Sequence, residues 1–138
     1  MRVCTLGTFD MFHRGHVNLL ARCRTLAGDG EVVVGLNLDE FVEAYKGRRP
    51  VIDYSDRAAV LRSCRYVDVV VPNVGKNDCK PILMAVRPDL LVVGSDWRDR
   101  DYHAQIDASP AWLEQRGIRL VFLPYTADIS TTLIRERM

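Results

Sequence analysis

The sequence predicts an α/β fold, a Rossmann-like doubly wound sheet of five parallel strands with helices on both faces. Two observations carry this prediction. Short apolar runs rich in β-branched residues are typical of fully buried strands, and segments with helical spacing separate these runs. Such alternation joins parallel strands through right-handed crossovers. The expected strands are residues 3–6, 32–36, 67–71, 90–93 and 120–123.

Helices are expected between the strands and after the last one. In the first of them, apolar residues recur at helical spacing until Gly28 ends the pattern, and Gly117 closes the fourth in the same way. A further short helical stretch precedes Lys46. The longest irregular segment is expected from residue 95 to about residue 109. The expected helices are residues 16–27, 55–64, 80–86, 110–116 and 131–137.

Length and composition favour one domain, residues 1–138, with a substantial core, since 48% of the residues are hydrophobic. A net charge of +1 with interspersed signs argues against a nucleic-acid or membrane surface. No apolar run approaches the roughly 18 residues of a membrane span, and no signal-peptide pattern opens the chain. We therefore expect a cytoplasmic protein. The four cysteines show no Cys-x-x-Cys spacing and are expected to be buried thiols.

Two histidines lie three residues apart where the first strand gives way to a helix. His13 and His16 are short-armed donors, and the helix N-terminus that follows favours an anion. Gly15 removes the side chain that would keep a phosphate away. The alternatives are a buried pair satisfied by backbone carbonyls, or a metal site, which needs a third ligand that this segment does not clearly supply. The pattern favours a phosphate site, and no metal-ligating residue is predicted.

The strand order of a doubly wound sheet places its ligand beyond the carboxyl ends of the strands, where that order reverses. Three loops are expected to open onto this edge. The first carries the histidines, the second is residues 94–97 after the fourth strand, and the third is residues 126–132 after the fifth strand.

Two motifs extend this picture to a known family. Residues 7–16 read Gly-Thr-Phe-Asp followed by His-x-Gly-His, and residues 129–132 read Ile-Ser-Thr-Thr. Together they resemble the nucleotidyltransferase family that includes the cytidylyltransferases of glycerol 3-phosphate. The resemblance implies transfer of a cytidylyl group from CTP to a small phosphorylated alcohol, with glycerol 3-phosphate favoured. The alternatives are an adenylyltransferase that uses ATP on a sugar phosphate or flavin mononucleotide, and a nucleotide-binding domain without catalysis.

The resemblance also assigns roles to residues. The catalytic residues that it implies are His13, His16, Lys46 and Arg48. The residues implied to hold the nucleotide are Gly7, Thr8, Phe9, Asp10, Gly15, Asp96, Thr126, Ile129, Ser130 and Thr131. The residues implied to hold the acceptor are Asp10, Arg57, Asp96 and Trp97. Structural alternatives stay open: a solvated basic loop at Lys46, an N-cap at Ser130 and a turn cap at Asp96.

The chain departs from the family pattern at several positions. Arg48 replaces a lysine, and Ser95 replaces an aspartate. Tyr125 and Asp128 replace an arginine and a glycine, so Arg135 or Arg48 would have to supply the missing positive charge.

The expected reaction is direct in-line displacement, because the attacking phosphate is already an anion and needs no general base. A magnesium ion bound mainly through the triphosphate is the expected cofactor. The expected partners are the nucleoside triphosphate and the phosphorylated acceptor, with no nucleic acid and no membrane. The resemblance implies a homodimer.

Overall fold

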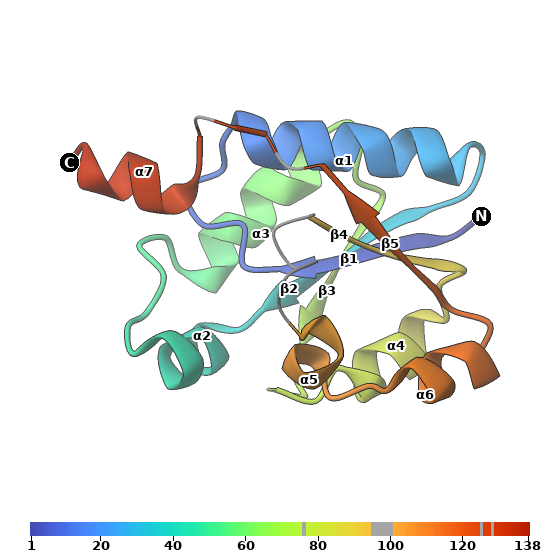
Figure 1. Ribbon diagram of the computed structural model, residues 1–138. Coiled ribbons are helices and arrows are strands. Elements are labelled where there is room, and N and C mark those ends of the chain that lie inside the picture. Colours follow the sequence, from blue (N-terminus) through green and yellow to red (C-terminus); the bar gives the residue numbers. More distant parts are fainter. Residues whose placement is uncertain (76, 95–100, 125, 128) are drawn as a thin grey trace.

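A parallel sheet forms the centre of the protein, as the apolar runs predict (Figure 1). The computed structural model describes residues 1–138 apart from 76, 95–100, 125 and 128. The strand order is β3-β2-β1-β4-β5, and every pair is parallel. The strands are β1 (Val3–Gly7), β2 (Val32–Asn37), β3 (Val69–Asn73), β4 (Leu90–Gly94) and β5 (Arg119–Leu123). The order reverses between β1 and β4, so the switch point of a doubly wound sheet lies at the carboxyl end of β1.

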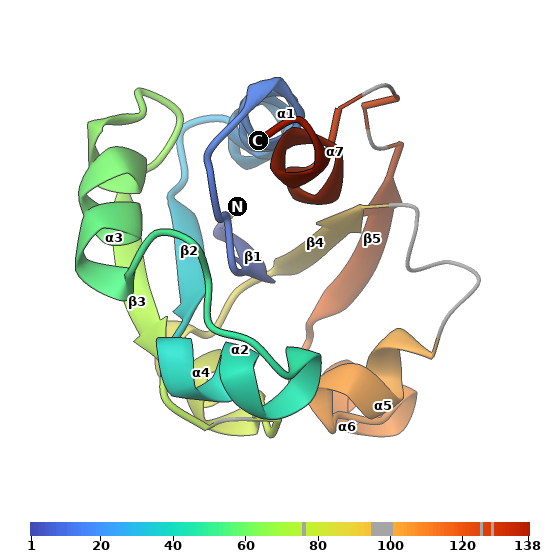
Figure 2. The same cartoon turned by 90° about the vertical axis from the view of Figure 1, so that its left-hand side faces the viewer.

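Helices cover both faces of the sheet (Figures 1 and 2). On one face α1 (Arg14–Ala27) and α3 (Tyr54–Ser63) pack Leu20, Ala58 and Leu61 against the strands. On the other face lie α4 (Lys80–Val86), α5 (Tyr102–Ile106) and α6 (Pro110–Gln115). Two short helices, α2 (Asp39–Lys46) and α7 (Thr131–Glu136), lie beyond the carboxyl ends of the strands. The predicted fold class is therefore confirmed.

The prediction was wrong in one segment. Part of the stretch expected to be irregular forms α5, because the Asp101 carboxylate accepts a hydrogen bond from the Ala104 amide and caps the helix. Tyr102 and Ile106, four residues apart, are both buried in the core. This short helix forms one wall of the site described below.

Smaller differences concern ends of elements and the thiols. Helix α1 begins at Arg14, two residues earlier than expected, with His13 as its N-cap. Cys4, Cys23 and Cys79 are buried and Cys64 is half-buried, all as free thiols. Burial raises the pKa of the Cys4 thiol to about 12. Within the described part of the chain, every helix is too short or too polar to cross a membrane.

Candidate active site

Two adjoining cavities open at the switch point of the sheet. The large cavity, about 580 Å³, lies over the ends of β1, β2 and β3 between α2, α5 and α7. The small cavity, about 270 Å³, lies over the ends of β1, β4 and β5. Both share residues 6–9 together with His16, Ser130 and Thr131, so the loop after β1 and the start of α7 separate them. The larger volume lies within the range of small-molecule sites, about 300–1,000 Å³.

His13 and His16, three residues apart, cap the N-terminus of α1. The amide of Gly15 donates to Nδ1 of His13 at 3.1 Å, and the amide of His13 donates to Nδ1 of His16 at 3.2 Å. The pair forms a reciprocal capping box in which imidazoles replace the usual hydroxyl and carboxylate. The two rings stack with centroids 3.8 Å apart. A Cβ at Gly15 would lie 2.9 Å from Cε1 of His13, so this glycine is needed for the ring to fold back onto its own helix.

This arrangement fixes the tautomer of both histidines. Because each Nδ1 accepts a hydrogen bond from an amide, the proton of the neutral ring lies on Nε2. Burial lowers the pKa of His13. Burial and the neighbouring His13 together lower the pKa of His16 to about 3. At neutral pH both rings are therefore uncharged and present an Nε2–H donor.

A neutral, half-buried His16 makes stability depend on pH. In the unfolded chain its imidazole takes up a proton near pH 6.5, whereas in the folded protein it stays neutral down to about pH 3. The unfolded state thus binds more protons between these values, so the free energy of unfolding falls as the pH is lowered through this window. We expect urea denaturation at pH 7 and pH 4 to show a larger loss for the wild type than for His16→Gln. Equal losses would contradict the assigned neutral state.

The loop between β1 and α1 is held in an unusual backbone conformation. Phe9 and Met11 have φ angles of 51° and 50°, a region that side chains other than glycine rarely adopt. Such strain gathers at functional loops, where surrounding contacts hold it in place. Here the carboxylate of the intervening Asp10 accepts hydrogen bonds from the amides of Val51 and Ile52 at 2.7 and 2.9 Å. Asp10 thereby joins this loop to the segment that follows Lys46.

The start of α7 lies against the loop that carries the histidines. The hydroxyl of Thr131 donates to the carbonyl of Asp10 at 2.8 Å and lies 3.4 Å from Nε2 of His13. Ser130 is the N-cap of α7, since its hydroxyl accepts from the amide of Leu133. The imidazoles and the hydroxyl-bearing turn are thus brought together although more than 100 residues separate them in sequence.

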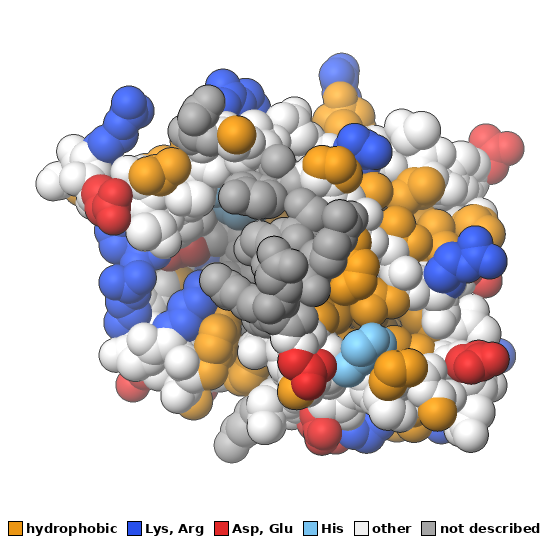
Figure 3. Space-filling view, viewed as in Figure 1, with side chains coloured by type: hydrophobic (Ala, Val, Ile, Leu, Met, Phe, Trp, Pro, Cys, Tyr) orange, Lys and Arg blue, Asp and Glu red, His pale blue; other side chains and the backbone are white. Residues whose placement is uncertain are grey.

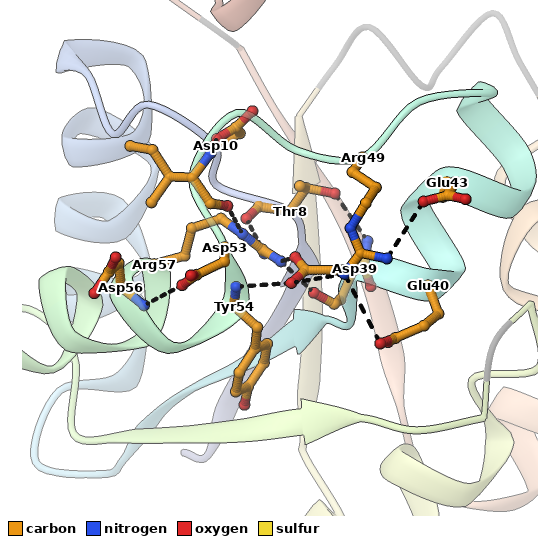
Figure 4. Close-up of polar contacts among 12 residues, drawn as sticks. Thr8, Asp10, Asp39, Glu40, Glu43, Arg49, Asp53, Tyr54, Asp56 and Arg57 are labelled. Carbon is orange, nitrogen blue, oxygen red and sulfur yellow. Dashed lines mark hydrogen bonds and ion pairs between the residues drawn. The ribbon is translucent and has the colours of Figure 1, made fainter.

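A buried arginine joins several segments beneath the site by hydrogen bonds and an ion pair (Figure 4). Arg57 is 2% exposed and donates to the carbonyls of Thr8, Asn37 and Ile52. It also forms an ion pair with Asp39 at 2.6 Å. Burial alone would raise the pKa of the Asp39 carboxyl, but the Arg57 hydrogen bond, the Tyr54 amide and nearby positive charges lower it. Arg57 lies below the lining of both cavities, so its geometry favours a positioning role over direct contact with an acceptor.

Positive charge surrounds the large cavity. Its lining includes Lys46, Arg48, Arg49 and Arg135, while the only lining carboxylate among the described residues, Asp10, is bound to two amides. Arg49 forms ion pairs with three carboxylates of α2, but in the described part of the chain neither Lys46 nor Arg48 forms one. Figure 3 shows basic side chains gathered at the end of the molecule where α2 and α7 lie. This cavity is suited to anions.

Apart from Arg57, the predicted site residues fall into three groups. Those of the first loop, the basic segment and α7 line the two cavities. Thr126 and Ile129 line the small cavity, where the Thr126 hydroxyl accepts a hydrogen bond from the Asn18 side chain. Asp96 and Trp97, like Tyr125 and Asp128, lie outside the described residues, and their roles stay predictions. The sequence analysis missed Asn37 and Asn73 on the large cavity, because an asparagine at the end of a strand carries no motif.

Comparisons with known proteins show what the chain as a whole is similar to. The family model described as cytidylyltransferase-like matches residues 4–137. The chain is 36% identical to a FAD synthase of Korarchaeum cryptofilum, covering 99% of this chain and 90% of that protein. It is 35% identical to a glycerol-3-phosphate cytidylyltransferase of Bacillus subtilis, covering 99% and 96%. A solved lipopolysaccharide core biosynthesis protein from Thermoplasma volcanium shares the fold, with a TM-score of 0.73, 24% identity and coverage of 91% and 98%.

Proposed function

The chain belongs to the cytidylyltransferase-like family, and we propose that it transfers a cytidylyl group from CTP to a small phosphorylated alcohol, with glycerol 3-phosphate favoured. Full-length similarity to a protein named glycerol-3-phosphate cytidylyltransferase supports this choice. One structural observation carries it: two neutral imidazoles keep their Nε2–H groups free of the backbone where the cavities meet, and His16 lines the large cavity together with cations without ion-pair partners among the described residues.

The reaction asks the protein to align two anions and to stabilise charge. The acceptor phosphate attacks the α-phosphorus of the triphosphate, and pyrophosphate leaves on the opposite side. His13 and His16 donate hydrogen bonds through Nε2 to oxygens of the reacting phosphate, and neutral donors do this without transferring a proton to the nucleophile. Lys46, the last residue of α2, and Arg48 form no ion pair with any described residue, so they approach the departing pyrophosphate and neutralise its charge. Thr131 holds the first loop against α7 and keeps His13 in place.

Magnesium enters this proposal as part of the substrate complex. The described residues contain no group of three or more side chains suited to hold a metal ion, and both oxygens of Asp10 accept amide hydrogen bonds. We therefore propose that Mg²⁺ is held by phosphate oxygens and water, where it neutralises triphosphate charge. The expected homodimer stays a prediction, and light scattering on the purified protein tests it.

A second candidate function follows from the FAD synthase relative. In it ATP replaces CTP and flavin mononucleotide replaces glycerol 3-phosphate. The phosphate chemistry is the same, since both acceptors are monophosphates of a polyol chain.

A substrate panel tests both candidates. The purified protein is incubated with CTP or ATP, each with glycerol 3-phosphate, flavin mononucleotide or no acceptor, with Mg²⁺ or with EDTA, and pyrophosphate release is followed. We expect release with CTP, glycerol 3-phosphate and Mg²⁺ together. Release with ATP and flavin mononucleotide alone would favour the second candidate. Binding of a triphosphate without release under any condition would instead indicate a nucleotide-binding domain.

Arg135 is expected to replace the arginine that this chain lacks before the Ile-Ser-Thr-Thr motif. It lines the large cavity, and its buried Nε has no hydrogen-bond partner among the described residues. A charge-assisted hydrogen bond to phosphate contributes about 1.5–3 kcal/mol. We expect Arg135→Met to raise the KM for the triphosphate about 10-fold with little change in kcat, measured by steady-state pyrophosphate release. Arg137→Met, on the exposed end of the same segment, is the matched control, and equal effects of both would refute the role.

A further inference from the structure

A hydrogen-bonded row of polar side chains lines the large cavity at the ends of the strands. Asn37 and Asn73 end β2 and β3 and are register partners, and Thr8 follows β1 directly. Asn73 Nδ2 donates to Asn37 Oδ1 at 3.1 Å, and Asn37 Nδ2 donates to Thr8 Oγ1 at 3.2 Å. All three residues line the cavity. Their hydrogen bonds hold both carboxamides in a defined orientation across three neighbouring strands.

One hydrogen-bond acceptor in this row of polar side chains has no donor in the described part of the chain. Asn73 is 1% exposed, and its Oδ1 is buried without a hydrogen-bond partner among the described residues. Its Nδ2 is already used, toward Asn37 and at 3.5 Å toward the sulfur of Cys79. An unpaired buried acceptor is destabilising, and most buried polar atoms in native proteins are paired. An apolar side chain at the end of the valine-rich strand β3 would avoid this cost.

The position of Asn73 indicates which substrate it meets. The residues assigned to the triphosphate, Lys46, Arg48 and Arg135, belong to α2, α7 and the basic segment at the large cavity, and Thr126 and Ile129, assigned to the nucleotide, line the small cavity. Asn73 lies instead on the β3 side, two strands from β1, and neighbouring strands are about 4.8 Å apart. The oxygen thus lies roughly 10 Å across the sheet from the loop that carries the histidines. A phosphate at the imidazoles and a hydroxyl two or three carbons away span such a gap.

We propose that Oδ1 of Asn73 accepts a hydrogen bond from a hydroxyl group of the acceptor, and that Asn37 and Thr8 hold it in place for that contact. The large cavity would then select monophosphates of polyols over alkyl monophosphates. This inference rests on the proposed transfer to a phosphorylated acceptor. Glycerol 3-phosphate and the ribityl phosphate chain of flavin mononucleotide both supply the required hydroxyl, so the selection concerns the chemistry that they share.

The wild-type protein provides the first test. Pyrophosphate release is measured with glycerol 3-phosphate, with flavin mononucleotide and with n-propyl phosphate, which has the same three-carbon chain as glycerol 3-phosphate and no hydroxyl. We expect kcat/KM for the better polyol phosphate to exceed that for n-propyl phosphate by at least about 30-fold, because the alkyl chain leaves the buried oxygen unpaired. Equal use of the alkyl and polyol phosphates would overturn the inference. Absence of release with every acceptor would overturn the proposed function, and the inference with it.

Substitution of Asn73 assigns the selection to this residue. Asn73→Leu removes the acceptor at similar volume, and we expect it to lower kcat/KM for the polyol phosphate about 30-fold, mainly through KM. The value for n-propyl phosphate and the KM for the triphosphate should stay within about two-fold. Val74→Ala, at the exposed neighbouring residue, should change neither. An equal loss with both acceptors, in a variant whose thermal unfolding matches the wild type, would show that Asn73 has only a structural role.

Discussion

Replacing His16 with alanine is expected to lower the turnover of nucleotidyl transfer by about 100-fold or more, the loss typical of a donor that acts on transition-state charge. The Nδ1 of His16 is bound to the His13 amide, so Nε2–H is the group that the ring presents to substrate. At neutral pH the ring is uncharged, since burial lowers its pKa to about 3. The measurement is kcat for pyrophosphate release with CTP, glycerol 3-phosphate and Mg²⁺.

His16 also caps α1, so a loss of activity must be separated from a loss of structure. His16→Gln supplies a side-chain acceptor at the same capping position, as in an ordinary capping box. We expect it to recover the thermal stability lost in the alanine variant but not the turnover. Arg22→Ala, an exposed change on the same helix, should leave both unchanged. Near-normal turnover in pure His16→Ala protein would contradict the assigned role.

The second large effect is expected at Lys46. Lys46→Ala should lower turnover by about 100-fold, because a cation that meets the departing pyrophosphate acts mainly in the transition state. Lys46 lines the large cavity at the end of α2 and forms no ion pair with any described residue, so its charge is available to a ligand. The measurement is again steady-state kcat and KM for the triphosphate, with the loss expected mostly in kcat.

Arg49 is the matched comparison for Lys46. It lies in the same basic segment, but ion pairs with Asp39, Glu40 and Glu43 hold its guanidinium on α2. We expect Arg49→Ala to lower turnover far less than Lys46→Ala and to show its effect in thermal unfolding instead. If Lys46→Ala left the rate unaffected, the basic segment would be a solvated surface loop.

The fold could be predicted from the sequence because a parallel sheet buries both of its faces. Each strand then reads as a nearly continuous apolar run, and β2, which is buried throughout, is the clearest case. Helix α5 escaped prediction because its five residues complete little more than one turn, too few for a periodic pattern. Its cap at Asp101 and its two buried side chains depend on contacts with the core.

The candidate site could be predicted in part. The strand-to-helix transition at the first loop and the hydroxyl-bearing motif at α7 are local patterns, and the switch-point rule brings them to one edge. The place of Arg57 could not be predicted, because its hydrogen-bond partners come from three separate segments that only the folded chain assembles. The same holds for Asn73, whose partner Asn37 is 36 residues away.

The central claim is that the two imidazoles hold the reacting phosphate at the junction of the cavities. A crystal structure of the protein with CTP and Mg²⁺ tests it most directly. We expect oxygens of the α-phosphate within hydrogen-bond distance of Nε2 of His13 and His16, with the outer phosphates toward Lys46 and Arg135. A triphosphate bound away from both rings, or imidazoles turned from it with their Nδ1–amide bonds intact, would contradict the account.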